Sequence, residues 1–375
     1  MSRSWSISRR TFLGLSAASL ALLGLGGCGS VQPSGSAVSL TAEPEKRKLQ
    51  GSFDPVQARV GLILGPPSMG LAQFVLAARA KRTVNDFSFT SNGVDYIGLS
   101  AALNQGDYDI ATLPSNIGPI LYNNHELQNS YQVISVNNLG ILYVMTTDPS
   151  ISTLSDLAGR RVYAYGEGGP PEYTIQALLK KKGLEGSFEL EFKSTPFEVL
   201  NLMQQEDKCV AILPQPFISL SKLMVDPLYA PISITREWNE AFADTGSQCV
   251  TTITVANRAF IEEHEQAIVE YLQMQGSSVS WTLEHMDEAA ALQEELDLFL
   301  NNSVAADALP DVALTCLCGT EMRRALSGYI AELFAVNPDA VGGELPDDRF
   351  YYLPPVGAIE DEAIGLAAAN ARVRA

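Results

Sequence analysis

One stretch decides how the chain is interpreted: residues 154–183, with the sequence LSDLAGRRVYAYGEGGPPEYTIQALLKKKG. Residues 161–165 alternate in polarity, which predicts a half-buried strand. The glycines at 166, 168 and 169 allow a sharp turn, and the two prolines that follow favour the start of a helix. Apolar residues at helical spacing predict a helix from Glu172 to Gly183. The stretch is therefore a strand, a glycine turn and a helix whose N-terminus can hold a small polar or anionic group.

A second strand, glycine turn and helix of the same kind lie nearer the N-terminus. An apolar strand at 58–64 precedes Gly65-Pro66-Pro67-Ser68-Met69-Gly70, and a helix is expected over 71–81. Strands alternating with helices at this spacing predict parallel sheets, which bind ligands outside the carboxyl ends of their strands. Helices are expected to dominate from residue 259 onward. Further strands are expected at 87–90, 110–113, 131–137, 139–146, 188–193, 207–213, 228–235 and 248–256.

The N-terminus is typical of an export signal. Arginines at positions 3, 9 and 10 precede an apolar run over 12–25, which is too short to span a membrane. Ser8-Arg9-Arg10-Thr11-Phe12-Leu13 is similar to a twin-arginine signal, so residues 1–27 are predicted to be a Tat-type lipoprotein signal peptide. Leu25-Gly26-Gly27-Cys28 is similar to a bacterial lipobox, which implies a lipid on Cys28. Residues 28–50 are expected to form a flexible tether.

The composition describes a globular and strongly acidic chain. It is 46% hydrophobic and 18% charged, and the residues after the tether suffice for two lobes with cores of their own. Without the signal peptide the chain has 22 basic and 43 acidic residues, a net charge of −21. Such a charge does not suit nucleic acid or an anionic membrane surface, so no nucleic-acid partner is expected.

Four cysteines follow the lipobox: Cys209, Cys249, Cys316 and Cys318. An exported location permits disulfides. Cys316 and Cys318 are too close together in an extended segment to bridge easily, so a disulfide is expected between Cys249 and one of them, Cys316 for example. The Cys-x-Cys pair lacks a second pair of ligands for a metal ion, so no metal site is expected.

Several segments together carry a resemblance to a known family. They are residues 65–72, 105–111 (QGDYDIA), 154–162 (LSDLAGRRV), 168–173, 213–217 (LPQPF) and 342–348 (GGELPDD). With these segments and its lipobox, the chain resembles the solute-binding lipoproteins of bacterial ABC importers, in the group that handles nitrate, sulfonates, taurine and thiamine-pyrimidine precursors.

The resemblance implies an α/β, two-lobed periplasmic-binding-protein fold of type II, with mixed and parallel sheets flanked by helices. Lobe 1 would hold residues 51–146 plus 250–352, lobe 2 residues 147–249, and residues 353–375 would be a C-terminal tail. The hinge would consist of two chain crossings, near 143–148 and 247–250.

The implied mechanism is binding rather than catalysis. A small-molecule ligand would lie between the lobes, and closure would signal the ABC permease and its ATPase. Each candidate residue also has a structural interpretation, such as capping for Ser68, packing for Met69 and Phe217, and complementing a helix dipole for Glu172. The expected ligand-binding residues are Ser68, Met69, Ser115, Asn116 and Asn138 in lobe 1, and Gly168, Gly169, Glu172, Tyr173, Gln215 and Phe217 in lobe 2.

The residues in these loops indicate which class of solute the protein binds. None of them carries Lys or Arg, whereas Glu167 and Glu172 lie in or beside them. A neutral or partly cationic organic molecule, such as an aminopyrimidine, therefore fits at least as well as a sulfonate, and nitrate fits less well. The chain lacks HExxH, G-x-S-x-G and Walker A motifs, so no catalytic residue and no cofactor are expected.

The mature protein is expected to be a monomer that is exported and lipid-anchored to the outer face of the cytoplasmic membrane. Two alternatives stay open at this point. One is a ligand-sensing surface lipoprotein without transport, and the other is a pyrimidine-synthesis enzyme on the same fold.

Overall fold

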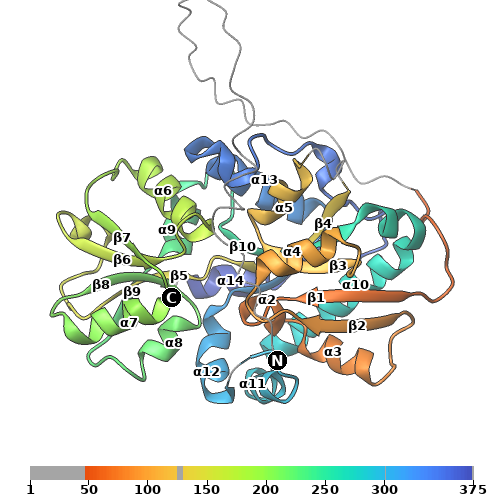
Figure 1. The fold of residues 1–375 in the computed structure, drawn as a ribbon, viewed down its shortest axis with the longest axis horizontal. Helices are drawn as coiled ribbons and strands as arrows, with labels where there is room; N and C mark the ends of the chain where they lie inside the picture. Colours follow the sequence, from red (N-terminus) through yellow and green to blue (C-terminus); the bar gives the residue numbers. More distant parts are fainter. Residues whose placement is uncertain (1–46, 125–129, 300, 374–375) are drawn as a thin grey trace, which may run out of the picture. The chain divides into compact units, whose positions relative to one another are not determined.

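The computed structural model describes residues 47–124, 130–299 and 301–373 (Figure 1). The predicted signal peptide, Cys28 and most of the predicted tether lie outside the described residues. Within the described residues, no helix is both long and apolar enough to cross a membrane.

The strands form two sheets. The larger has seven strands in the order β12-β11-β4-β10-β3-β1-β2, and the smaller has five in the order β7-β6-β8-β5-β9. β1 pairs in parallel with β2 and β3, and β6 pairs in parallel with β7 and β8. The remaining pairs are antiparallel. Two mixed sheets flanked by helices confirm the predicted fold class.

The strands are β1 (Gln57–Leu62), β2 (Asp86–Ser91), β3 (Ile110–Pro114), β4 (Tyr131–Leu139), β5 (Leu142–Thr146), β6 (Arg161–Tyr165), β7 (Glu189–Lys193), β8 (Val210–Pro214), β9 (Tyr229–Ser233), β10 (Val250–Asn257), β11 (Leu314–Leu317) and β12 (Ala363–Ile364). The α-helices are α2 (Pro66–Met69), α3 (Ala72–Arg79), α4 (Tyr96–Asn104), α5 (Ile117–Tyr122), α6 (Pro170–Lys182), α7 (Pro196–Gln205), α8 (Phe217–Ser221), α9 (Ile234–Ala241), α10 (Arg258–Glu284), α11 (Met286–Glu295), α12 (Asn302–Ala308), α13 (Gly319–Val336) and α14 (Leu366–Val373). Short 3-10 helices are η2 (Leu154–Leu157), η3 (Leu309–Asp311), η4 (Pro338–Val341) and η5 (Asp348–Phe350).

We call residues 142–241, which hold the five-stranded sheet, the second lobe. The described residues 47–139 and 250–373, which hold the seven-stranded sheet, are the first lobe. One buried apolar cluster includes residues from both sheets, such as Val136 and Val162. A second cluster lies between α3 and α10 around Phe74 and Tyr271, and a third lies under α7 and α8 around Met203. The two lobes therefore share part of their hydrophobic core.

Three boundaries differ from the sequence-based expectation. β5 was expected in lobe 1, which was taken to run to residue 146, but it pairs with β8 and β9 in the smaller sheet, so the chain changes sheets at Gly140 and Ile141. The residues 353–375 are not only a tail, because β12 pairs with β11 at the edge of the larger sheet. β11 itself was missed, since four buried residues between helices give no alternation in polarity.

The end of the predicted tether also belongs to the folded body. The guanidinium of Arg47 donates to both carboxylate oxygens of Glu265, at 2.6 and 2.7 Å. The backbone N–H of Gln50 and the hydroxyl of Tyr352 donate to the same carboxylate. Burial opposes ionisation of Glu265, but these hydrogen bonds outweigh it and lower the pKa of the carboxyl group. The fold therefore begins by Arg47 rather than at residue 51.

The predicted disulfide is not formed. Cys209, Cys249, Cys316 and Cys318 are all buried free thiols. Cys249 packs against Gly140, whereas the thiol of Cys316 lies 3.7 Å from the carbonyl oxygen of Leu272 in α10. Burial raises the pKa of the Cys249 thiol to about 12, so it stays protonated. These thiols serve as small apolar groups in the core.

The two chain crossings between the sheets meet at Gly140. A methyl group at Gly140 would lie 2.7 Å from the sulfur of Cys249 and still closer to the hydroxyl of Thr235. Thr235 lies at the start of α9 in the second lobe, and Cys249 lies in the return crossing just before β10. Only a residue without a side chain fits between them.

Replacing Gly140 with alanine should therefore destabilise the protein. Overpacking of this kind lowers the free energy of unfolding by about 1–3 kcal/mol, which urea denaturation of the purified protein measures. Gly169→Ala is the matched control, because a methyl group there would have its nearest neighbour at 3.3 Å. If Gly140→Ala were no more damaging than Gly169→Ala, the two crossings would not be packed as described.

Candidate functional site

Two predicted ligand-binding residues, Ser68 and Met69, are fully buried in the first lobe. The Ser68 hydroxyl lies 3.1 Å from the carbonyl oxygen of Gly65, to which it donates. The Met69 carbonyl oxygen accepts from the side-chain amide of Gln293 at 2.7 Å, and the Met69 side chain belongs to the apolar core. Met69 thus makes the contacts of a core methionine. Ser68 does not cap a helix, because its hydroxyl donates to a carbonyl oxygen and neither α2 nor α3 has a side-chain N-cap bond.

Asn138 is likewise held inside the larger sheet. Its Nδ2 donates to the carbonyl oxygen of Val312 at 2.8 Å, and its Oδ1 accepts from the hydroxyl of Thr252 on the neighbouring β10. The side chain is fully buried. These bonds join β4 to β10 and to the segment before β11.

Ser115 lies where the two lobes meet. Its hydroxyl donates to the carbonyl oxygen of Val250 at 2.7 Å. The hydroxyl of Tyr329, on α13, hydrogen-bonds Ser115 and lies 2.7 Å from Oγ1 of Thr174 in the second lobe. Burial raises the pKa of Tyr329, so its hydroxyl keeps its proton. A strand-end residue of the first lobe and the first turns of α6 are thereby joined through one tyrosine.

Asn116, beside Ser115, is only partly satisfied. Its Nδ2 lies 3.4 Å from the carbonyl oxygen of Ala340, to which it donates. Its buried Oδ1 has no hydrogen-bond partner among the described residues. This acceptor is the polar atom that the predicted first-lobe residues leave unused.

The glycine turn of the second lobe is organised by Glu172. Its carboxylate accepts from the backbone N–H of Gly168 at 2.6 Å and from the side-chain amide of Gln176 at 2.8 Å. Tyr173 is half-buried and hydrogen-bonds Asn337 of the first lobe. Burial and the nearby Glu172 raise the pKa of Tyr173. Glu172 thus holds the turn that contains Gly168 and Gly169, while Tyr173 contacts the other lobe.

The side-chain amide of Gln215 has hydrogen-bond partners at its oxygen but not at its nitrogen. It follows β8 and is 2% exposed. Its Oε1 accepts from the backbone N–H and the hydroxyl of Ser219, at 3.3 and 3.1 Å. Its Nε2, also buried, has no hydrogen-bond partner among the described residues. Phe217, by contrast, packs edge-on against Phe197 with ring centroids 6.0 Å apart, which supports its structural interpretation.

A cavity of about 390 Å³ opens beside Gln215. Its polar lining comes from β5, β9, α8 and α9 of the second lobe and from η3 of the first lobe. Of the predicted ligand-binding residues, only Gln215 lines it. Its volume falls within the range of small-molecule sites, about 300–1,000 Å³. The polar lining residues are Tyr143, Gln215, Lys222, Ser233, Arg236 and Asp311.

The charges of this cavity were not predicted from the sequence. Lys222 lies just beyond α8 and pairs with Asp307 of the first lobe at 2.8 Å. The guanidinium of Arg236, in α9, makes no hydrogen bond or ion pair with the part of the chain that the structure describes. Both cations lie outside the strand-end loops, which themselves contain no Lys or Arg.

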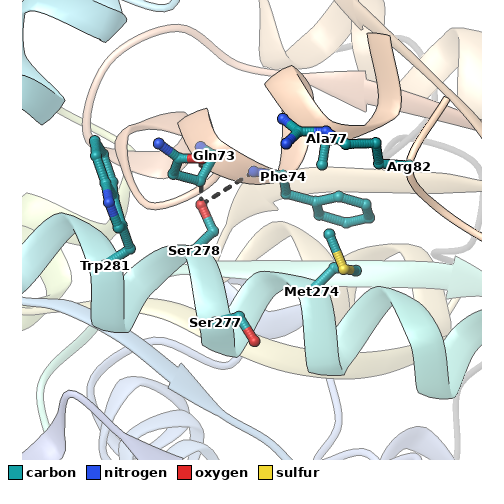
Figure 2. Close-up of a pocket in the computed structure, with 8 residues that line it drawn as sticks. All are labelled: Gln73, Phe74, Ala77, Arg82, Met274, Ser277, Ser278 and Trp281. Carbon is teal, nitrogen blue, oxygen red and sulfur yellow. Dashed lines mark hydrogen bonds between the residues drawn. The ribbon is translucent and has the colours of Figure 1, made fainter. Parts of the chain in front are cut away.

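A second cavity, of about 260 Å³, lies wholly within the first lobe (Figure 2). It is formed between α3 and α10, with Phe74 and Met274 on one side of Ser278 and Trp281 on the other. The hydroxyl of Ser278 accepts from the backbone N–H groups of Gln73 and Phe74. No predicted ligand-binding residue lines this cavity, so the cavity beside Gln215 is the stronger candidate. Among the described residues, no group of three His, Cys, Asp or Glu side chains could hold a metal ion.

Comparison with known proteins is informative at the level of structure. No protein-family model matches the sequence, and no curated protein matches it. An ABC transporter protein from Parabacteroides distasonis has a TM-score of 0.65 at 19% identity, over 79% of this chain and 98% of that one. The periplasmic aliphatic sulphonate binding protein SsuA from Escherichia coli has a TM-score of 0.63 at 15% identity, over 80% and 93%.

The chain has the fold of the periplasmic binding proteins of ABC transporters. A third example is the ligand-binding component of an ABC-type import system from Staphylococcus aureus, solved with zinc bound, with a TM-score of 0.57 at 11% identity over 80% of this chain and 96% of that one. A sulphonate in one name and zinc in another indicate that this fold does not itself specify a ligand.

The contact between Tyr329 and Thr174 can be tested by a double-mutant cycle. Tyr329→Phe and Thr174→Val each remove one side of a buried hydrogen bond between the lobes. We expect a coupling energy of about 0.5–1.5 kcal/mol in the free energy of unfolding. Tyr131→Phe with Thr174→Val is the control pair, because the Tyr131 hydroxyl donates within the first lobe, to Leu103. Additive effects in the first cycle would contradict the contact.

Proposed function

We propose that this protein is the extracytoplasmic substrate-binding component of an ABC importer. It captures a small organic solute between its two lobes and delivers it to the permease and ATPase. The observation that carries the proposal is the cavity beside Gln215, which is lined by residues of both lobes. The side-chain amide of Gln215 is buried and has no hydrogen-bond partner for its Nε2 among the described residues. The fold shared with periplasmic binding proteins supports the same reading.

Closure of the lobes is the proposed signal. A solute that touches both lobes stabilises the closed state by the difference in its contacts between the two states. Gln215 and Arg236 are on the second lobe and Asp311 is on the first, so a guest in this cavity contacts both. The chain crossings at Gly140–Ile141 and at residues 242–249 would then act as the hinge.

The proposed location follows from the N-terminal segments. The twin-arginine signal and the lipobox at Cys28 suggest export and a lipid anchor on the outer face of the cytoplasmic membrane. Since Arg47 is bound to Glu265, the anchor would hold the first lobe directly and leave the second lobe to move. We propose that the protein acts as a monomer in this setting.

The proposed solute is small and organic. Sulfonates, taurine and aminopyrimidines are the classes to compare first. The strand-end loops lack cations, which suits an aminopyrimidine, whereas Lys222 and Arg236 in the cavity lining suit a sulfonate. Sensing without transport differs from the proposal only in lacking a permease. A pyrimidine-synthesis activity has no support from a histidine among the described residues that line the cavity.

A thermal-stability screen of the mature protein tests the proposal. The panel contains sulfonates, nitrate, bicarbonate and pyrimidines. Each compound is tested on the wild-type mature protein and on variants with a substitution in one of the two cavities. A true solute at 100 times its dissociation constant should raise the free energy of unfolding by about 2.7 kcal/mol. Gln215→Ala should reduce this gain, whereas Gln73→Ala, in the first-lobe cavity, should preserve it. A solute that stabilises both variants and the wild type equally would contradict a site beside Gln215.

A further inference from the structure

Gln215 lines the cavity, and the described chain leaves the donors of its side-chain amide unused. The two N–H groups of the Gln215 amide are buried and lack a partner among the described residues. Leaving such a group unsatisfied costs about 1–3 kcal/mol, so an acceptor from a guest is the expected partner. The Ser233 hydroxyl also lines the cavity and, although its oxygen accepts from the backbone N–H of Arg236, its own proton can be donated.

One cation of the same lining, Arg236, has no carboxylate partner among the described residues. Arg236 and Lys222 contribute two positive charges, and Asp311 contributes one negative charge. The charge of Lys222 is offset by its pairing with Asp307, whereas the Arg236 guanidinium has no carboxylate partner among the described residues. With Asp307 and Asp311 counted, the charges around the cavity balance, and the guanidinium of Arg236 is the charged group of the lining that is left to bind an anion.

We infer that this cavity binds a small organic anion through a carboxylate group held by Arg236 and the side-chain amide of Gln215. A guanidinium presents a planar pair of donors that matches a carboxylate, and the amide adds a donor from β8. Ile218, Pro231 and Pro310 supply apolar surface for the carbon part of the guest. The inference deepens the proposed function and rests on it in taking the solute to lie between the lobes.

Matched pairs of compounds separate charge from shape. Calorimetric titration of the mature protein compares acetate with acetamide, butyrate with butyramide, and benzoate with benzamide. Since a hydrogen bond to a charged group contributes about 1.5–3 kcal/mol, at least one carboxylate should bind about tenfold or more tightly than its amide. If no carboxylate saturates the protein, or if each amide binds as well as its carboxylate, the inference is overturned.

Two variants locate the effect. Arg236→Gln should bring the carboxylate and amide affinities together, and Gln215→Glu should weaken carboxylate binding while its oxygen still accepts from Ser219. Arg79→Gln is the control, since Arg79 is exposed on α3 and remote from the lining, and it should keep the full ratio. Urea denaturation verifies that each variant is folded.

The outcomes distinguish this inference from the proposed function. A carboxylate preference that survives Arg236→Gln overturns the inference, because the anion is then held elsewhere. If the stability screen finds a solute dependent on Gln215 but the paired compounds show no preference for charge, the inference fails and the proposed function stands. If neither experiment finds a guest beside Gln215, both fail.

Discussion

The close packing of the two chain crossings at Gly140 is the constraint on which the rest of the structure depends. The outgoing chain has no side chain at this point, and the space is filled by Thr235 of α9 and by the Cys249 thiol of the return crossing. Interiors packed to this density do not deform continuously, so the two sheets are held at a narrow connection. The hydroxyl of Tyr329 adds a polar contact across the same boundary, between Ser115 and Thr174.

Most of the polar side chains at the strand ends already have hydrogen-bond partners within the chain. Ser68, Ser115 and Asn138 all donate to backbone carbonyl oxygens, and Glu172 accepts from its own turn. Buried polar groups are almost always paired, so the few that are not are informative. Oδ1 of Asn116 and Nε2 of Gln215 are such atoms among the described residues, and Gln215 lines a cavity with walls from both lobes. A buried polar atom without a hydrogen-bond partner is therefore a better indication of a binding site than a polar residue at a strand end.

The sequence predicts the alternation of strands and helices well, because periodicity in polarity is a local property. It does not predict which sheet β5 joins, since an apolar strand fits either sheet and only long-range pairing decides. The binding of Arg47 to Glu265 escapes prediction for the same reason, because the two residues are 218 positions apart. Arg236 and Lys222 were missed because attention to strand-end loops excludes cations that helices bring to the same cavity. Gln215 is the predicted ligand-binding residue that lines this cavity, and its place directly after a strand is what suggested it.

The most direct test of a two-lobed binding protein is the distance between its lobes. Spin labels can be attached to cysteines introduced at Arg79 in the first lobe and Glu185 in the second, which are both exposed, because the native cysteines of the described residues are buried. Cys28 is replaced by alanine for this measurement. Double electron–electron resonance with and without a saturating solute should give a shorter and narrower distance distribution when the solute is bound. An unchanged distribution at saturation would contradict capture by closure of the two lobes.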